Sequence, residues 1–185
     1  TASIPRESDA VLYTHAGPEV AVASTKAFVA QITAAYLLGL YLAQVKGAMF
    51  RDEIHQVLDS LKDMPRKIQW VLDTQPKTIQ AAAERMVNAN SFLFLGRHVG
   101  YPVALEGALK LKEIAYTFTE GFAAGELKHG PIALVDEGEP VVFIVPPERG
   151  RNVLHAKVIS GIEEVKARGA YIIACLLYTS PSPRD

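Results

Sequence analysis

Two carboxylates and one amine stand at helical spacing in the segment 105–114. Glu106, Lys110 and Glu113 are separated by four and three residues, so on a helix they lie within about 60° of one another. The rest of the segment is mostly apolar, which leaves little free surface and indicates a half-buried position. A carboxylate beside an ammonium group can move protons to and from a substrate. An ordinary surface stripe of ion pairs has the same spacing.

A second polar group stands in the loop 125–131, which contains two glycines. His129 follows Lys128 and precedes Gly130 and Pro131. Glycine permits unusual backbone angles and proline fixes the direction in which the chain leaves the loop. A histidine held in this way is a candidate acid–base group, because imidazole titrates near physiological pH. The plainer interpretation is a polar surface loop with a solvated histidine.

The third candidate is the start of a helix predicted over 24–46. Val22 and Ser24 lie just before or at its first turn, and Thr25 follows. The N–H groups at a helix start, together with the two hydroxyl groups, can bind a phosphate or a sugar oxygen. A simple N-cap by Ser24 or Thr25 is the alternative. No histidine in the chain has the spacing of a metal ligand, so we expect no metal site.

Alternating strand and helix patterns in the second half of the chain position the first two candidates. The run 92–95 is wholly apolar and ends in Gly96, which is typical of a buried parallel strand. Strand patterns return at 140–145 and 170–174, and helix patterns lie at 102–118 and 153–168. A Gly- and Ala-rich loop and a short helical turn follow the first of these helices. This alternation predicts an α/β fold with a parallel sheet flanked by helices, flavodoxin- or Rossmann-like.

The first half of the chain is dominated by helix patterns. The helix over 24–46 is apolar nearly all round, which predicts deep burial. A short β-compatible segment, 10–13, precedes it; an amphipathic stretch over 51–73, broken at Pro65, and a helix over 76–88 follow it. We therefore predict two partial α/β units joined by a helical connector. The expected divisions are 1–48 (end of the first unit), 49–87 (connector and lead-in helix) and 88–174 (front of the second unit).

Composition and the chain ends narrow the function classes. The 19 basic and 20 acidic residues give a net charge of -1, so charge offers no reason to expect nucleic acid or a membrane as partner. No signal peptide opens the chain, and the apolar stretch 27–43 is too short and too polar for a confident membrane span. Cys175 is the single cysteine, which fits a cytoplasmic setting. The run 175–185 does not continue the α/β pattern, and we expect it to be a non-native tail.

Several blocks of sequence, in one order along the chain, resemble the glucosamine-6-phosphate synthase family, whose isomerase half has two sugar-isomerase (SIS) domains. Val-Ala-Ser-Thr-Lys-Ala-Phe at 22–28 is similar to the end of the first SIS domain. The segment 104–114 and Ala-Ala-Gly-Glu-Leu-Lys-His-Gly-Pro at 123–131 are similar to the front of the second. The resemblance covers residues 1 to about 174.

The resemblance implies a role for each candidate. Glu113 would move the proton between C1 and C2 of the sugar, and Lys110 would position or polarise it. His129 would assist opening of the sugar ring, in the site of a neighbouring subunit of a homodimer. Val22, through its backbone, and Ser24 would contact the sugar.

The resemblance also implies the whole reaction. Fructose 6-phosphate and ammonia, released from glutamine by a separate glutaminase domain, would give glucosamine 6-phosphate without metal or organic cofactor. The glutaminase domain, the phosphate-binding loop and a Schiff-base lysine would lie elsewhere in a full-length enzyme, so we expect this fragment alone to be inactive. The alternatives are an SIS-type sugar-phosphate isomerase or deaminase, and a sugar-phosphate-sensing module without catalysis; Glu113 beside Lys110 argues against the second.

Overall fold

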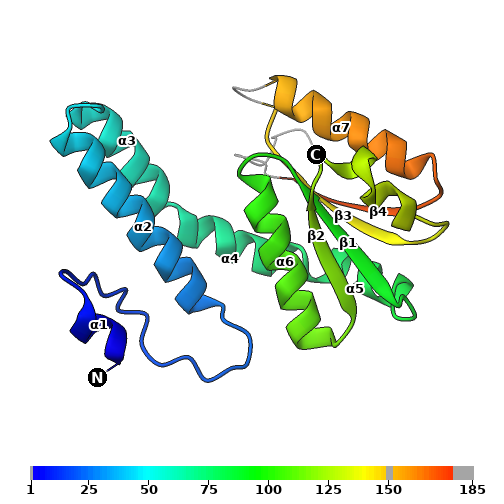
Figure 1. The fold of residues 1–185 in the computed structure, drawn as a ribbon, viewed down its shortest axis with the longest axis horizontal. Helices are drawn as coiled ribbons and strands as arrows, with labels where there is room; N and C mark the ends of the chain where they lie inside the picture. Colours follow the sequence, from blue (N-terminus) through cyan, green and yellow to red (C-terminus); the bar gives the residue numbers. More distant parts are fainter. Residues whose placement is uncertain (1, 149–151, 177–185) are drawn as a thin grey trace. The chain divides into compact units, whose positions relative to one another are not determined.

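The computed structural model describes residues 2–148 and 152–176, which divide into two compact units. The first unit ends at Ala81 and the second begins at Ala82. The division falls inside helix α5 (Pro76–Arg85). Figure 1 labels the elements of both units.

The second unit is built on a parallel β-sheet, as the alternating pattern predicts. Its described strands have the order β2-β1-β3-β4, and every neighbouring pair is parallel. The strands are β1 (Ser91–Gly96), β2 (Phe118–Ala123), β3 (Pro140–Val145) and β4 (Tyr171–Leu176). The expected α/β fold with a parallel sheet flanked by helices is therefore confirmed.

Helices cover the sheet on both faces. Residues of α6 (Gly100–Ala115) pack with the even-numbered side chains of β1, and residues of α7 (Asn152–Lys166) pack with the odd-numbered ones. Because neighbouring side chains of a strand point to opposite faces, the two helices lie on opposite sides of the sheet (Figure 1). The α7 face holds the larger core cluster, in which Phe143 and Leu95 are fully buried.

The edge strand β2 corrects the prediction of a loop after the 102–118 helix. That helix, α6, ends at Ala115, where Tyr116 takes a left-handed conformation with φ of 55°. Thr119 in the strand is fully buried and its hydroxyl donates to the carbonyl of Ala108 at 2.6 Å. The strand was missed because an edge strand has few buried apolar residues, and this one relies on a single buried threonine.

The described part of the first unit is helical. It contains α1 (Ser3–Glu7), α2 (Lys26–Val45), α3 (Arg51–Lys62) and α4 (Met64–Thr74). The break predicted at Pro65 lies between α3 and α4, with the proline in the first turn of α4. No strand forms at 10–13 because the described residues of this unit offer no other strand to pair with. Two partial α/β units therefore stay a prediction, as do the domain divisions.

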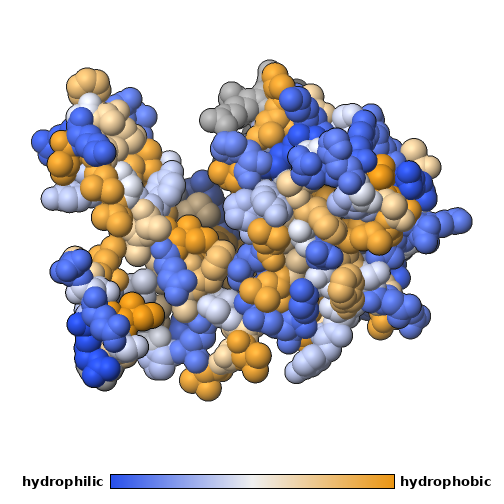
Figure 2. All heavy atoms as spheres, in the orientation of Figure 1, coloured by the Kyte–Doolittle hydropathy of each residue, from blue (hydrophilic) through white to orange (hydrophobic). Residues whose placement is uncertain are grey.

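Helix α2 is apolar as predicted, but its expected deep burial is wrong within this unit. Leu40 is its one buried residue among those described, while Ile32 and Tyr36 are about half exposed. Apolar side chains of the helical unit form part of the orange surface in Figure 2. The reason is that, within the described residues, α3 is the element with which α2 makes its main contact. The apolar pattern indicates that another part of a protein covers the surface of α2, but it does not identify that part.

Length and composition alone would allow α2 to cross a membrane. No other helix in the described residues meets the same test. One such helix is weak evidence for a membrane span, because the core helices of soluble proteins also pass it.

Replacing Gly96 by Ala is expected to destabilise the second unit by about 3 kcal/mol. A Cβ at Gly96 would overlap the carbonyl oxygen of Gly100 and stand 2.7 Å from the amide nitrogen of Tyr101. Both are backbone atoms at the start of α6, so β1 and α6 would have to separate. Urea unfolding followed by circular dichroism measures the loss.

Gly161→Ala in α7 is the matched control for this prediction. A Cβ there meets only Phe143 Cε1, at 3.7 Å, and alanine favours a helix interior by about 1 kcal/mol. The control should unfold at the same or a higher urea concentration than the unchanged chain. Equal midpoints for the two variants would contradict the close approach of β1 and α6.

Candidate functional site

Helix α6 brings Glu106, Lys110 and Glu113 together on one face, as their spacing predicts. The Lys110 Nζ lies 2.5 Å from a Glu113 carboxylate oxygen and 3.5 Å from a Glu106 oxygen. All three side chains are between 22% and 29% exposed. The group is therefore half-buried and held by charge-assisted hydrogen bonds, which are stronger than bonds between neutral groups.

The packing of α6 on the sheet explains where this face points. Ala104 and Ala108 are buried against β1 and β3, and Gly107 lies so close to Phe94 that a Cβ there would stand 2.9 Å from the ring. At about 100° per residue, the three charged side chains lie roughly opposite this packed face. Small residues hold the helix against the sheet, and the charged face is turned away from it.

The charge of Lys110 is stabilised by its neighbours. The hydrogen bond that Lys110 donates to Glu113 is the largest cause of a raised pKa of the lysine, and attraction to both carboxylates adds to it. Lys110 therefore stays an ammonium group at neutral pH. An ammonium group beside a carboxylate supplies two tools, a base that can accept a proton and a cation that can stabilise negative charge on a substrate oxygen.

His129 lies at the end of the short helical turn predicted after Gly125. The turn consists of η1 (Leu127–His129) and η2 (Pro131–Leu134), and Gly130 between them has φ of 149°, a conformation open to glycine. The imidazole is exposed. Within the part of the chain that the structure describes, no hydrogen bond or ion pair joins His129 to Lys110 or Glu113. The structure thus gathers the α6 group without joining His129 to it.

At the start of α2, a glutamate from the preceding loop occupies the position expected for a Ser24 or Thr25 cap. Neither hydroxyl caps the helix. The Glu19 carboxylate instead accepts hydrogen bonds from the backbone N–H groups of Thr25 and Lys26, at 2.7 and 3.0 Å. It also accepts hydrogen bonds from the hydroxyl groups of Thr25 and Ser24, at 2.9 and 3.3 Å. The donors that the sequence offered to a phosphate are therefore held by a carboxylate of the chain itself.

This arrangement affects what Ser24 and Val22 can offer a ligand. Because Ser24 donates its hydroxyl hydrogen to Glu19, the lone pairs of its oxygen remain available to accept a hydrogen bond. The side chain of Val22 is 88% exposed. Glu19 was missed from the sequence because it lies in an irregular loop, where no periodicity connects it to the helix that it caps.

The sequence pattern that defines the SIS domain matches residues 85–181. This chain belongs to the SIS-domain family. The matched region includes the described sheet, α6 with its charged group, and the turn that carries His129.

Individual relatives of this SIS-domain chain share one name. The glutamine–fructose-6-phosphate aminotransferase (isomerizing) of Corynebacterium efficiens is 68% identical over 171 residues, which are 92% of this chain and 27% of that protein. The protein of the same name from Streptomyces coelicolor is 60% identical over 171 residues, 92% of this chain and 28% of its own length. The chain thus spans about a quarter of the length of the curated relatives it matches.

A solved structure extends the likeness to three dimensions. The C-terminal domain of glucosamine-fructose-6-phosphate aminotransferase from Francisella tularensis superposes with a TM-score of 0.85 at 40% identity. The match covers 91% of this chain and 46% of that structure. The SIS fold of the second unit is therefore supported by sequence and by structure.

The predicted site residues fall in two parts of the chain. Lys110, Glu113 and His129 belong to the unit with the SIS sheet, whereas Val22 and Ser24 belong to the helical unit. The two units are described separately, so the roles of these five residues remain predictions.

Lowering the pH is expected to loosen the start of α2 through Glu19. Hydrogen bonds, above all from the Thr25 N–H, lower the pKa of Glu19 below its ordinary value of 4.5. The stabilisation is therefore fully present above about pH 4.5 and is lost as the pH falls through the lowered pKa. The amide proton shifts of Thr25 and Lys26, followed by NMR, should titrate in this range in the unchanged chain and stay flat in Glu19→Gln.

Glu7→Gln provides the control for this pH dependence. Glu7 lies in α1 and changes the charge of the same unit by the same amount, so the two amide shifts should titrate in this variant as in the unchanged chain. Titration of the Thr25 and Lys26 amides that persists in Glu19→Gln would show that another group caps α2.

Proposed function

We propose that this chain is part of a glutamine–fructose-6-phosphate aminotransferase and carries the residues that convert a ketose to an aldose. Support comes from the relatives that bear this name, at 68% identity over nearly the whole chain. It also comes from the Francisella tularensis structure of the same kind. The substrate is fructose 6-phosphate and the product glucosamine 6-phosphate. An SIS-type isomerase or deaminase, or a sensing module, has less support because the high-identity relatives are named as aminotransferases.

The ion pair between Lys110 and Glu113 is the observation that carries this proposal. A proton shift between C1 and C2 next to a carbonyl or imine needs one base that takes a proton and returns it. Glu113 is a half-buried carboxylate with a cation 2.5 Å away. That cation can stabilise the negative charge that develops on the sugar oxygen. Glu113 is therefore the proton carrier in this proposal, and Lys110 the group that polarises the sugar.

His129, Val22 and Ser24 complete the proposed site. An exposed histidine on a glycine-flanked turn is suited to reach a neighbouring subunit, where it would assist ring opening in a homodimer. The backbone of Val22 and the Ser24 hydroxyl would contact the sugar. With its hydrogen donated to Glu19, Ser24 is prepared to accept a hydrogen bond from a sugar hydroxyl.

The remaining parts of the reaction belong to a longer protein in this proposal. The chain covers 27% of the Corynebacterium efficiens relative, and a glutaminase domain that releases ammonia from glutamine would lie outside it. The half-exposed apolar residues of α2 fit a helix that other parts of such a protein cover. We propose a cytoplasmic enzyme that needs no metal or organic cofactor and has neither nucleic acid nor membrane as partner.

A chimera tests the proposed function. The 171 matched residues of the Corynebacterium efficiens protein are replaced by those of this chain, and glucosamine 6-phosphate formed from fructose 6-phosphate and glutamine is measured by chromatography. We expect a rate within about tenfold of the parent, since aligned cores at this identity repack without changing the fold. A chimera that hydrolyses glutamine but forms no glucosamine 6-phosphate would contradict the proposal.

A further inference from the structure

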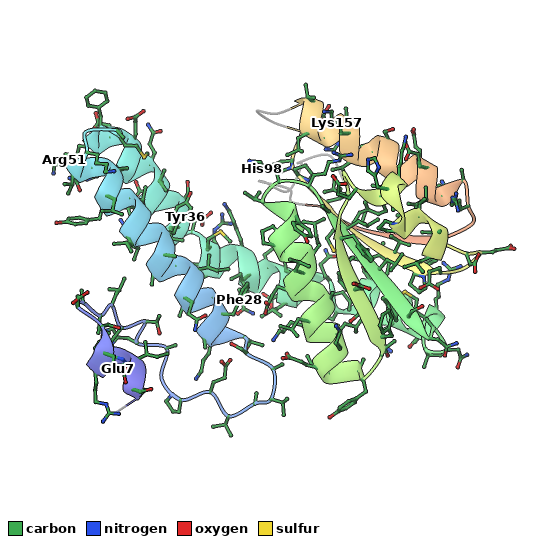
Figure 3. The ribbon with its side chains drawn as sticks, viewed as in Figure 1. Glu7, Phe28, Tyr36, Arg51, His98 and Lys157 are labelled. Atoms are coloured by element: carbon green, nitrogen blue, oxygen red, sulfur yellow. The ribbon has the colours of Figure 1, made fainter. Side chains whose placement is uncertain are left out.

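A hollow of about 280 Å³ lies beside α7 at the carboxyl ends of β1 and β2. Arg97, which directly follows β1, and Gly125, which follows β2, line one side. Lys128 of η1 and Lys157 of α7 line it as well. Figure 3 labels Lys157 on α7 and His98 next to Arg97 in the chain, at the same end of the sheet. Three segments far apart in the sequence thus meet at one place.

The hollow has an excess of positive charge. Among the described residues that line it, Arg97, Lys128 and Lys157 contribute three cations, and Glu164 is the one carboxylate. Glu164 lies 2.8 Å from the Lys128 Nζ and pairs with it. Arg97 and Lys157 are then left without a carboxylate in the lining. Such a concentration of cations favours an anion in the hollow.

Arg97 is held in place with unused hydrogen-bonding capacity. One of its terminal nitrogens donates to the carbonyl of Ala124 at 3.3 Å. Its Nε is buried and has no hydrogen-bond partner among the described residues. A Cβ at Gly125 would stand 3.2 Å from the guanidinium, so glycine keeps the space beside it open. A buried donor without a partner costs free energy, which a bound acceptor would recover.

The sheet has a reversal of chain direction between β1 and β3, next to the hollow at the ends of β1 and β2. The chain leaves β1 for β2 in one direction, and it leaves β3 for β4 in the other. In open parallel sheets such a reversal opens a crevice outside the carboxyl ends of the strands, and ligands bind there. Arg97 follows β1, one of the two strands that border this reversal, and so connects the hollow to it.

We propose that this hollow binds the phosphate group of a small molecule as its dianion. A guanidinium offers paired donors that match phosphate oxygens, and lysine adds a point charge. The inference goes beyond the proposed function and does not depend on it, because the hollow lies on the α7 face and the charged group of α6 belongs to the opposite helix layer. Free inorganic phosphate and a phosphate monoester share this chemistry.

Isothermal titration calorimetry of the chain with inorganic phosphate, at constant ionic strength, tests the proposal. Lys157→Gln should weaken binding by roughly tenfold, the loss of one hydrogen bond to a charged group. Glu164→Gln should tighten it at least about threefold, because the competing carboxylate is neutralised and Lys128 is released. Lys166→Gln is the matched control, because it makes the same charge change on the same helix outside the hollow.

The outcomes separate the sources and decide the proposal. Glycerol 3-phosphate that binds more tightly than inorganic phosphate, with the same response to Lys157→Gln, supports a phosphate monoester as the ligand. Equal affinities support the free ion. Equal weakening by Lys157→Gln and Lys166→Gln, or no binding up to about 10 mM phosphate by chains whose circular dichroism shows them folded, would overturn it. Neither readout depends on glucosamine 6-phosphate formation.

Discussion

Replacing Glu113 by Gln in the chimera should lower the kcat for glucosamine 6-phosphate formation by about 10²–10⁴-fold. Glutamine keeps the size of the side chain and can still accept a hydrogen bond from Lys110, but it cannot take up a proton. The effect should fall on kcat more than on KM, because the carboxylate acts in the transition state. Separate measurements of glutamate release and of amino sugar formation follow the two halves of the reaction.

Glu106→Gln is the matched control on the same helix. Its carboxylate lies 3.5 Å from the Lys110 Nζ, against 2.5 Å for Glu113, so it supports the lysine more weakly. We expect a loss below about tenfold, in line with a weak ion pair at a helix surface. Equal losses for Glu106→Gln and Glu113→Gln would show that the two carboxylates serve only to hold Lys110.

Replacing His129 by Asn should lower the same rate by about 10²-fold or more, because ring opening would lose its acid–base group. The expected position of His129 in the neighbouring site allows a sharper measurement. A Glu113→Gln subunit and a His129→Asn subunit are co-expressed with different affinity tags, and mixed dimers are isolated through both tags. One of the two sites then has an intact Glu113 and an intact His129, so about half of the unchanged activity should return.

A subunit with both substitutions is the control for this complementation. Paired with His129→Asn, it leaves no site with both residues intact, and the mixed dimer should stay inactive. If the first mixed dimer is as inactive as its parents, His129 acts within its own subunit or outside the site.

The sheet shows what sequence could predict in this fold. The strand at 140–145 was located at its observed ends because all six residues are buried, and a wholly apolar run between turns is a local signal. The edge strand 118–123 was missed. Gly121 lies there because the backbone of Leu105 in α6 comes within 3.0 Å of where a Cβ would be. That requirement is set by a helix residue sixteen positions earlier in the chain.

The candidate site shows the same difference between features with a local sequence signal and features without one. The group on α6 could be read from spacing because one helix turn fixes the distances between its members. The Glu19 cap could not, since Glu19 lies in an irregular loop without periodicity before α2. The hollow at Arg97 could not either, since the sheet brings its residues together from distant segments. For α2, an apolar pattern predicted that its faces are covered, and the described unit covers only one of them.

A crystal structure of the chimera with glucosamine 6-phosphate bound tests the central claim most directly, namely that Glu113 carries the proton between C1 and C2. The account predicts a Glu113 carboxylate oxygen about 3–3.5 Å from C1 or C2, the reach of a near-attack geometry. It also predicts the Ser24 oxygen against a sugar hydroxyl and the imidazole of a neighbouring subunit near the ring oxygen. A sugar bound with another carboxylate at C1 and C2, and Glu113 still paired with Lys110 away from it, would contradict the account.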